Sequence, residues 1–271
     1  MVIIAVLAIL AALLLPALAR AKASARFTEC KSNVKQISLA IAMYVGDNGS
    51  YPVVVATDFQ FPMWLAAIAP NLSLDASRQF YVGGQSYNKY SKLLVCPGDT
   101  LLPGMAGELP DMSYGYNTYG MSTFAGWNLP WADIGLAQLG LGGNRGRAAQ
   151  SSGLIWPPRS QDIVVPLHDS DVVVPAEMIE SGDAFAESYR VIYRGGGELI
   201  FNGADDLGVP GSPFNWDLRK LASARHGSRA NVAFCDGHVE GARFNDLFAE
   251  TDPAFQRWNS DHLPHRNLRI R

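Results

Sequence analysis

Residues 2–19, VIIAVLAILAALLLPALA, decide the fold because they contain no charged or polar side chain. About 18 such residues reach the lower limit for crossing a bilayer, since a helix rises roughly 1.5 Å per residue and the hydrocarbon core is ~30 Å thick. We therefore favour a membrane-spanning helix. A cleaved signal peptide is the alternative, because Ala17–Ala19 resembles a cleavage site, although no basic segment precedes the apolar run. A buried helix of a soluble protein is disfavoured, since nothing on the run is polar.

The chain after this run continues with a helical pattern. Residues 20–48 contain no proline, and Gly46 is their only glycine. Apolar and aromatic side chains recur there at three- and four-residue steps, which places them on one helix face: Val34, Ile37, Ile41 and Tyr44. Asn48–Gly49 and then Pro52 supply a stop. We predict one helix of about 47 residues, ~70 Å long, whose second half packs on a globular head. A removable signal peptide would not be expected to run on in this way.

The remaining sequence predicts a head rich in strands and turns, and hence an α+β fold. Runs of β-branched and aromatic residues predict strands at 161–168, 187–194 and 230–235. Residues 101–158 are rich in Gly, Pro, Asn and aromatic residues without clear periodicity, which predicts long irregular loops with short helices. The last segment, DHLPHRNLRIR (residues 261–271), predicts a loosely held tail. We divide the chain into a helix (1–50), a head (51–250) and a tail (251–271).

Composition and motifs argue against several classes of protein. The 271 residues carry a net charge of −3 and no block rich in Lys and Arg, which gives no case for a nucleic-acid partner. The sequence contains no P-loop and no convincing dinucleotide fingerprint. His226 with Asp183 would make a base and its orienter, but no serine or cysteine motif marks a nucleophile. We therefore expect no enzymatic activity.

Six segments follow one another in an order that is informative as a set. They are AILAALLLPALARAKASA (8–25), CKSNVKQISLAIAMYVGDNGSYP (30–52), LLVCPGD (93–99), SYGYN (113–117), PAEMIESGDA (175–184), and His226 followed after nine residues by Asp236-Gly237. Together they resemble the bacterial prepilin-like proteins that pair a type IV pilin N-terminal helix with a C-terminal H-x9-D-G domain. Such proteins are abundant in planctomycetes, verrucomicrobia and their relatives.

The resemblance implies a structural subunit that is anchored in the inner membrane with its head outside the cytoplasm. Its partners would be copies of itself and other pilin-like subunits, joined through the N-terminal helices into a type IV pilus-like filament or a type II secretion-like pseudopilus. Family precursors begin with a basic leader, a glycine and a Phe-Thr-Leu-Ile-Glu-like start, whereas this sequence begins inside the apolar run. We expect the leader to be encoded upstream; the alternative is that this copy is not processed. Four basic residues follow the apolar run, and without a leader they would favour a cytoplasmic head: Arg20, Lys22, Arg26 and Lys31. The basic charges of the leader would favour the opposite orientation of the helix.

Residues 231–244, NVAFCDGHVEGARF, predict a β-hairpin with a type I′ turn at Asp236–Gly237. On this structural interpretation, which we favour, Asp236 serves the turn. The His226 ring reaches back over the turn and bonds backbone groups there or Asp183, which ties the loop to the sheet. The alternative is that two imidazoles and two carboxylates converge near the end of the hairpin and bind zinc or manganese: Asp183, His226, Asp236 and His238. Apart from this divalent ion, we expect no cofactor.

A disulfide is expected if the head lies outside the cytoplasm, as the resemblance implies, because thiols tend to oxidise there. Cys30 follows the membrane-length run, and Cys96 ends the segment KLLVC just before Pro97. We predict a Cys30–Cys96 bond that joins the long helix to the head and leaves Cys235 free. The alternative is two separate buried thiols.

An aromatic-rich segment provides a second function hypothesis. Six rings fall within a short stretch of Gly and Asn residues: Tyr114, Tyr116, Tyr119, Phe124, Trp127 and Trp131. Packing beneath long loops is the commoner role of such rings. If they were exposed, they would favour a membrane-anchored module that binds a polysaccharide or another polymer.

Overall fold

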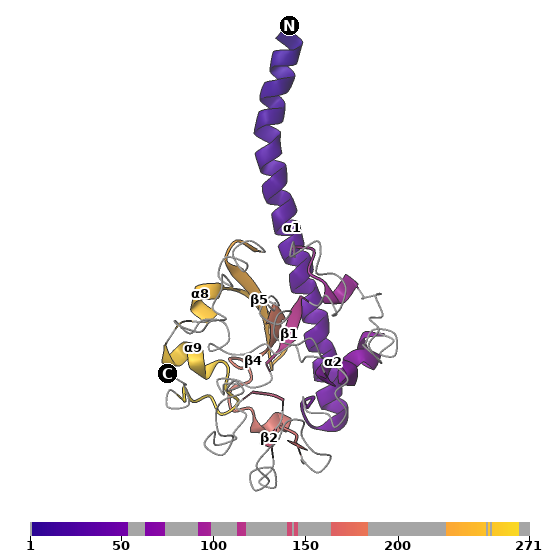
Figure 1. Ribbon diagram of the computed structural model, residues 1–271, viewed down its shortest axis with the longest axis vertical. Coiled ribbons are helices and arrows are strands. Elements are labelled where there is room, and N and C mark those ends of the chain that lie inside the picture. Colours follow the sequence, from indigo (N-terminus) through magenta and orange to yellow (C-terminus); the bar gives the residue numbers. More distant parts are fainter. Residues whose placement is uncertain are drawn as a thin grey trace, which may run out of the picture.

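The computed structural model describes residues 2–53, 63–73, 92–98, 113–117, 140–142, 144–145, 164–183, 226–247, 249 and 251–265. It has an α+β, pilin-like architecture in which one long helix projects from a head built on an antiparallel sheet (Figure 1). The predicted fold class is therefore confirmed.

Helix α1 (Val2–Asn48) is 47 residues long and continuous through Pro16, as predicted. Its buried residues all lie in the second half: Cys30, Asn33, Val34, Ile37, Ser38, Ala40 and Ile41. The helix ends because Gly49 adopts a φ of +68° and its N–H donates to the Val45 carbonyl at 2.7 Å. The predicted stripe is thus the part of α1 that enters the hydrophobic core, with Tyr44 packed at its margin.

A four-stranded antiparallel sheet forms the centre of the head. Its strands are β1 (Tyr114–Tyr116), β4 (Ile179–Asp183), β5 (Arg229–Phe234) and β6 (Val239–Arg243), in the spatial order β1-β4-β5-β6. A separate pair joins β2 (Asn144–Arg145) to β3 (Val164–Val165). The strand predicted at 230–235 is confirmed. Of the one predicted at 161–168, the structure describes 164–168, where β3 covers Val164–Val165. The one predicted at 187–194 lies outside the described residues. Strand β1 arises inside 101–158, where the sequence predicted irregular loops and short helices.

Helix α1 covers one face of this sheet, and the C-terminal segment covers the other (Figure 1). That segment contains α8 (Phe244–Leu247) and α9 (Asp252–Gln256). Phe255 and Trp258 are buried, and the Trp258 ring N–H donates to the Leu247 carbonyl at 3.1 Å. The predicted tail therefore begins too early, because these aromatic side chains are buried in the head instead of extending into solvent.

Short elements close the head around the lower half of α1. They are α2 (Met63–Ile68) and the 3-10 helices η1 (Ala69–Leu72), η2 (Lys92–Leu94) and η3 (Asp169–Asp171). The chain leaving α1 pairs with the segment before η3, since Ser50 bridges His168 and the Tyr51 N–H donates to the Leu167 carbonyl at 2.8 Å. The end of the helix is thereby fixed to the head.

The β5–β6 hairpin has a different turn from the predicted one. Phe234 and His238 close the loop, because the Phe234 N–H donates to the His238 carbonyl at 3.0 Å, which leaves three residues between them. Gly237 has a φ of +85°, whereas the φ of Asp236 does not lie in the positive region that a type I′ turn requires. This is the three-residue loop that ends in a left-handed glycine, so the two-residue type I′ prediction is wrong.

Within the part of the chain that the structure describes, α1 is the one helix long and apolar enough to cross a membrane. Its most apolar 18-residue window makes no buried contact with the head. By length and composition, α1 is a candidate membrane anchor or signal sequence.

Candidate functional site

The candidate site lies where α1 crosses the four-stranded sheet. Beneath the helix, one residue from each strand forms a continuous row across the sheet. Tyr114 of β1 is the register partner of Asp183 of β4, and Asn231 of β5 is the partner of Gly241 of β6. Asn231 joins the two halves of the row by hydrogen bonding to Asp183. The row therefore spans all four strands on the face that α1 covers.

Two positions of α1 contact this row, and a third lies between them on the helix. At one end, the Asn33 side-chain amide donates to the Tyr114 hydroxyl at 3.1 Å. At the other end, a Cβ atom on Gly241 would lie 2.5 Å from the Phe27 ring, so glycine allows the helix to approach the sheet. Between them, Cys30 is joined to Cys96 by a disulfide.

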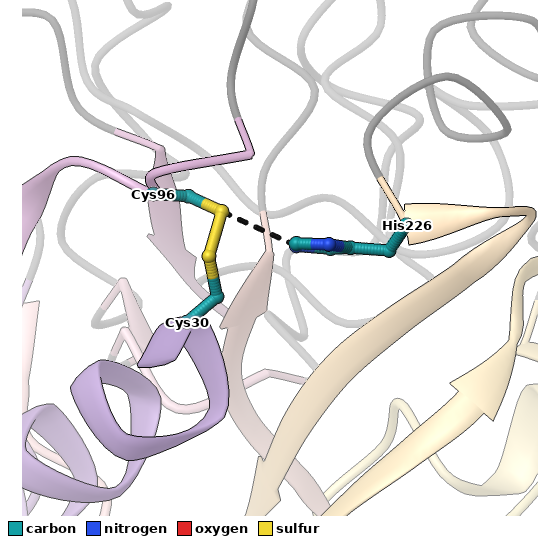
Figure 2. A group of neighbouring side chains, drawn as sticks. All are labelled: Cys30, Cys96 and His226. Carbon is teal, nitrogen blue, oxygen red and sulfur yellow. Dashed lines mark hydrogen bonds between the residues drawn. A yellow bond between two sulfur atoms is a disulfide. The ribbon is translucent and has the colours of Figure 1, made fainter. Parts of the chain in front are cut away.

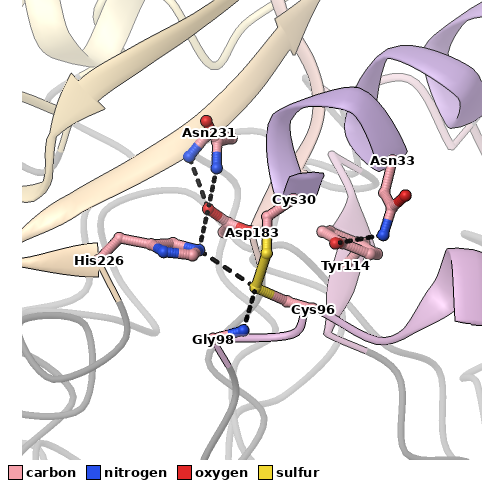
Figure 3. The surroundings of a disulfide bond; sticks show 8 residues. All are labelled: Cys30, Asn33, Cys96, Gly98, Tyr114, Asp183, His226 and Asn231. Atoms are coloured by element: carbon pink, nitrogen blue, oxygen red, sulfur yellow. Dashed lines mark hydrogen bonds and ion pairs between the residues drawn. A yellow bond between two sulfur atoms is a disulfide. The ribbon is translucent and has the colours of Figure 1, made fainter. Parts of the chain in front are cut away.

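The disulfide fastens α1 to the segment after η2, so the predicted Cys30–Cys96 bond is present. Cys30 is fully buried and Cys96 is 1% exposed, and their Cα atoms are 5.2 Å apart, within the usual range. The Gly98 N–H points at the Cys96 sulfur at 3.3 Å (Figure 3). Cys235 is the free cysteine, and burial raises the pKa of its thiol well above the usual value, so it stays protonated.

His226 lies against this disulfide, and its side chain is only 1% exposed. Its Nε2 atom is 3.2 Å from the Cys96 sulfur (Figure 2) and 3.7 Å from the Asp183 Oδ2 atom (Figure 3). The Phe27 ring packs edge-on against the imidazole, with the ring centres 5.2 Å apart. His226 thus contacts α1, the segment carrying Cys96, and β4 from its position just before β5.

Asp183 is a fully buried carboxylate. Its Oδ2 atom accepts hydrogen bonds from the Asn231 backbone N–H at 2.6 Å and from the Asn231 side-chain amide at 3.1 Å (Figure 3). A buried carboxylate is costly unless such donors face it, so Asn231 fixes both its position and its orientation.

The structure does not bring the four predicted metal ligands together. Asp183 and His226 lie at the start of β5, whereas Asp236 and His238 form an exposed pair beyond its end, with Oδ1 and Nδ1 2.6 Å apart. The six residues of β5 separate the pairs by roughly 20 Å. The metal hypothesis for this quartet is therefore wrong. The His226 ring does not lie over the turn, but it does face Asp183, the other partner expected for it.

The residues of the H-x9-D-G motif instead lie on either side of strand β5, and α1 is contacted at both ends of the strand. At the start of the strand, His226 contacts the disulfide to Cys30. At its end, the Lys35 ammonium group donates to the Gly237 carbonyl at 2.5 Å. Partial burial tends to raise the pKa of Asp236, but hydrogen bonds from the His238 N–H and ring outweigh it and lower this pKa below the usual value. Asp236 therefore stays ionised and supports the turn.

Sequence reasoning missed Glu180, which lies in β4 beneath α1 and is 2% exposed. Burial raises the pKa of this carboxyl to about 8, although hydrogen bonds with Ser38 and Ser181 and the charge of Lys35 act in the opposite direction. Glu180 sits at an irregular step in the β4–β5 register, between Ile179 and Ser181. That irregularity has no signal in the sequence, since alternation alone does not show which side of the sheet a bulged residue faces.

Two of the six aromatic residues proposed for polymer binding lie in the core. Tyr114 and Tyr116 are fully buried, and Tyr116 stacks on Trp64 with ring centres 5.5 Å apart. These two side chains therefore offer no surface to a polymer. The other four lie outside the described residues: Tyr119, Phe124, Trp127 and Trp131.

Comparison with known proteins finds one family. Residues 19–133 match the family described as "Protein of unknown function (DUF1559)". No curated protein and no solved structure matches the chain. The matched range contains the lower part of α1, both disulfide cysteines and β1, but it ends before Asp183 and His226. Over less than half of its length, the chain is therefore similar to the DUF1559 family, and this similarity is compatible with a pilin-like extracytoplasmic protein.

Proposed function

We propose that this protein is a membrane-anchored structural subunit that assembles through its N-terminal helix into a pilus-like filament or a pseudopilus. The observation that carries the proposal is the exposed upper half of α1. Large apolar side chains from Val2 to Leu18 are 49–77% exposed, on every side of the helix. So large an apolar surface has to be covered by lipid or by other proteins.

The lower half of the helix supports the same proposal. A detachable targeting segment needs no fixed contact with the domain it delivers, yet α1 is one continuous helix that is fastened to the head at several points. The disulfide at Cys30, the hydrogen bond from Asn33 and the contact of Lys35 with the hairpin turn lie within two turns. Displacement of the apolar segment would therefore carry the head with it, as assembly through the helix requires.

On this proposal, the subunit resides first in the inner membrane as a single-pass protein with its head outside the cytoplasm. Its partners are copies of itself and other pilin-like subunits, whose apolar helices would bundle while the heads form the surface. The proposal includes no catalytic step, because the buried sulfur atoms of Cys30 and Cys96 are bonded to each other and the Cys235 thiol stays protonated.

Single cysteines introduced into a Cys235→Ser background test topology and assembly together. Val173 is 65% exposed on the head, so Val173→Cys should react with a membrane-impermeant maleimide added outside the inner membrane. Leu10→Cys should escape that reagent but form a cross-linked dimer with a membrane-permeant bis-maleimide, because each subunit offers one thiol.

The two positions serve as controls for each other, because both side chains are at least half exposed in the isolated subunit. A head that reacts only after the cells are lysed would contradict the topology. A membrane-bound chain that gives no cross-linked species at Leu10→Cys would contradict assembly through the helix. A chain recovered without residues 2–19 would show that the segment is a cleaved signal.

A further inference from the structure

We propose that reduction of the Cys30–Cys96 disulfide creates a tetrahedral site for a divalent metal ion of the zinc class. Its ligands are the two cysteine sulfur atoms, the His226 Nε2 atom and the Asp183 carboxylate. The proposal does not rest on assembly through α1. It concerns the joint between helix and head, and it replaces the sequence-predicted quartet with a set that the fold brings together.

The four donors have the chemistry of a structural zinc site. Two thiolates and one imidazole are soft or borderline ligands, which suit Zn²⁺ and exclude Mg²⁺ and Ca²⁺ as preferred ions. A carboxylate is an accepted fourth ligand of zinc. The ligands come from α1, from the segment after η2, from β4 and from the residue at the start of β5, so one ion would hold all four parts of the head.

The separations between the donor atoms fit one tetrahedron. Zinc bonds of about 2.0–2.3 Å imply edges of roughly 3.3–3.8 Å between neighbouring ligand atoms. The His226 Nε2 atom is already 3.2 Å from the Cys96 sulfur and 3.7 Å from the Asp183 Oδ2 atom (Figures 2 and 3). The ligand atoms of Cys30, Cys96 and His226 all lie within 4.8 Å of one another. The required movement is separation of the two sulfur atoms once their bond is broken.

Contacts behind the donors support the same assignment. The Asn231 amide and backbone N–H hold the Asp183 Oδ2 atom, and the Gly98 N–H faces the Cys96 sulfur. Hydrogen bonds of this kind orient the ligands of known metal sites and tune their basicity. The Phe27 ring closes the site on the side of His226. The donors are thus held in place by groups that do not themselves bind the ion.

The conversion balances with a dithiol as the reductant. The dithiol gives two electrons and two protons to the Cys30–Cys96 bond, becomes a cyclic disulfide, and leaves two protein thiols. Zinc then binds the two sulfur atoms as thiolates, and two protons are released to solvent. The disulfide and the metal site exclude each other, because each uses the same two sulfur atoms. The disulfide would therefore hold α1 to the head under oxidising conditions, and the metal ion would hold it there under reducing conditions.

Cobalt provides a direct probe of the site in the full chain. The protein is kept in a non-ionic detergent, reduced with a phosphine, desalted without oxygen and titrated with Co²⁺. We expect one equivalent to bind, with a thiolate-to-cobalt charge-transfer band and the intense visible bands of tetrahedral Co²⁺. Zn²⁺ should displace it, and the oxidised chain should give neither band.

Variants distinguish the loss of a metal ligand from a general effect on folding. His226→Ala should weaken Co²⁺ binding by more than ~100-fold, beyond the loss typical of an outer contact, whereas Asn231→Ala should weaken it by roughly 10–100-fold. His238→Ala and Cys235→Ser, which alter side chains outside the set, should leave binding unchanged. His226→Cys should restore binding and strengthen the charge-transfer band, because it supplies a third thiolate.

Two results of the Co²⁺ titrations would overturn the proposal. One is a reduced chain that shows no charge-transfer band at saturating Co²⁺, and the other is a His226→Ala chain that binds as tightly as the unaltered protein. If reduction alone loosens the head, then Co²⁺ or Zn²⁺ should restore its near-ultraviolet circular dichroism. Failure of the metal to restore that signal would also overturn the proposal.

Discussion

At the scale of single residues, the two histidines around β5 show how burial decides a role. The His226 side chain is 1% exposed and sits between a disulfide and a buried carboxylate, whereas His238 is 44% exposed and pairs with Asp236 at the rim of a turn. Both occur in one short polar segment of the sequence. Their different roles follow from the strand between them, which places one beneath α1 and the other in solvent.

Replacing His226 should destabilise the protein far more than replacing His238. His226→Ala removes the ring that faces Asp183 and packs on Phe27, so we expect a loss of ~1–3 kcal/mol in the free energy of unfolding. His238→Ala changes an exposed pair and should cost less than ~0.5 kcal/mol. Denaturation of the oxidised full chain in detergent measures both. Equal losses in the two variants would contradict the assigned roles.

Glu180 should make the stability of the head depend on pH. Its pKa is about 8 in the folded chain against an ordinary value of 4.5, so the folded state keeps a proton that the unfolded state releases. Stability from this group therefore falls as pH rises from about 4.5 to 8, by up to ~1.4 kcal/mol per pH unit, and then levels off.

The Glu180→Gln variant tests this slope because glutamine mimics the protonated carboxyl at every pH. We expect the variant to gain stability over the unaltered protein progressively across that pH interval. Glu29→Gln, on the exposed face of α1, should follow the unaltered protein. Parallel curves for the Glu180 variant and the unaltered protein would rule out a buried, protonated Glu180.

At the scale of elements, the β5–β6 hairpin connects the turn residues to the long helix. Its three-residue loop places the Gly237 carbonyl within 2.5 Å of the Lys35 ammonium group on α1. The hairpin itself was predictable from Asp-Gly between alternating residues. The loop length was not, because an Asp-Gly pair serves both a two-residue turn and a three-residue loop that ends in glycine.

Substitutions at Gly237 should rank by their tolerance of positive φ. Gly237→Asn should cost little, whereas Gly237→Val should cost more, because a β-branched residue strongly disfavours the observed φ of +85°. Space is not the cause, since the nearest atom to an added Cβ would be the Lys35 Nζ at 3.8 Å. Thermal melting of the two variants gives the comparison. A valine variant as stable as the asparagine variant would contradict the turn assignment.

At the scale of the whole molecule, the sequence predicted the long helix, its core-facing stripe and its end, because these depend on local periodicity and on Gly49. It did not predict β1 or the packing of Phe255 and Trp258. Strand β1 is three residues long, and its pairing with β4 depends on contacts distant in the chain. The sequence pointed to the Cys30–Cys96 pair and to the His226–Asp183 pair, but their meeting at one place was missed for the same reason. Each residue was singled out, but only the sheet register and the crossing of α1 bring them together.

Removing residues 2–19 should leave a soluble and folded head. The deleted segment makes no buried contact, whereas Phe27, Cys30 and Asn33 keep the lower helix on the sheet. Expression in an oxidising compartment should give a monomer with a cooperative melting transition.

A longer deletion, of residues 2–34, serves as the control. It removes the disulfide and the contacts of Phe27 and Asn33, so the remaining head should lose its cooperative transition. If the shorter deletion were insoluble or melted without cooperativity, the division into an anchoring half and a packed half of α1 would be wrong.

The Cys30–Cys96 bond also determines how a subunit responds to tension along its chain. A pulling force that enters through the upper part of α1 passes at Cys30 into the sulfur bond and leaves at Cys96. The intervening chain, which spans a sequence separation of 66, is then bypassed and bears no load. Its contour length of roughly 220 Å, at about 3.3–3.6 Å per residue, cannot be extended while the bond is intact. The part of α1 after Cys30 and its junction with the head are thus shielded, and any lengthening under force has to come from the helix before Cys30 or from the chain beyond Cys96.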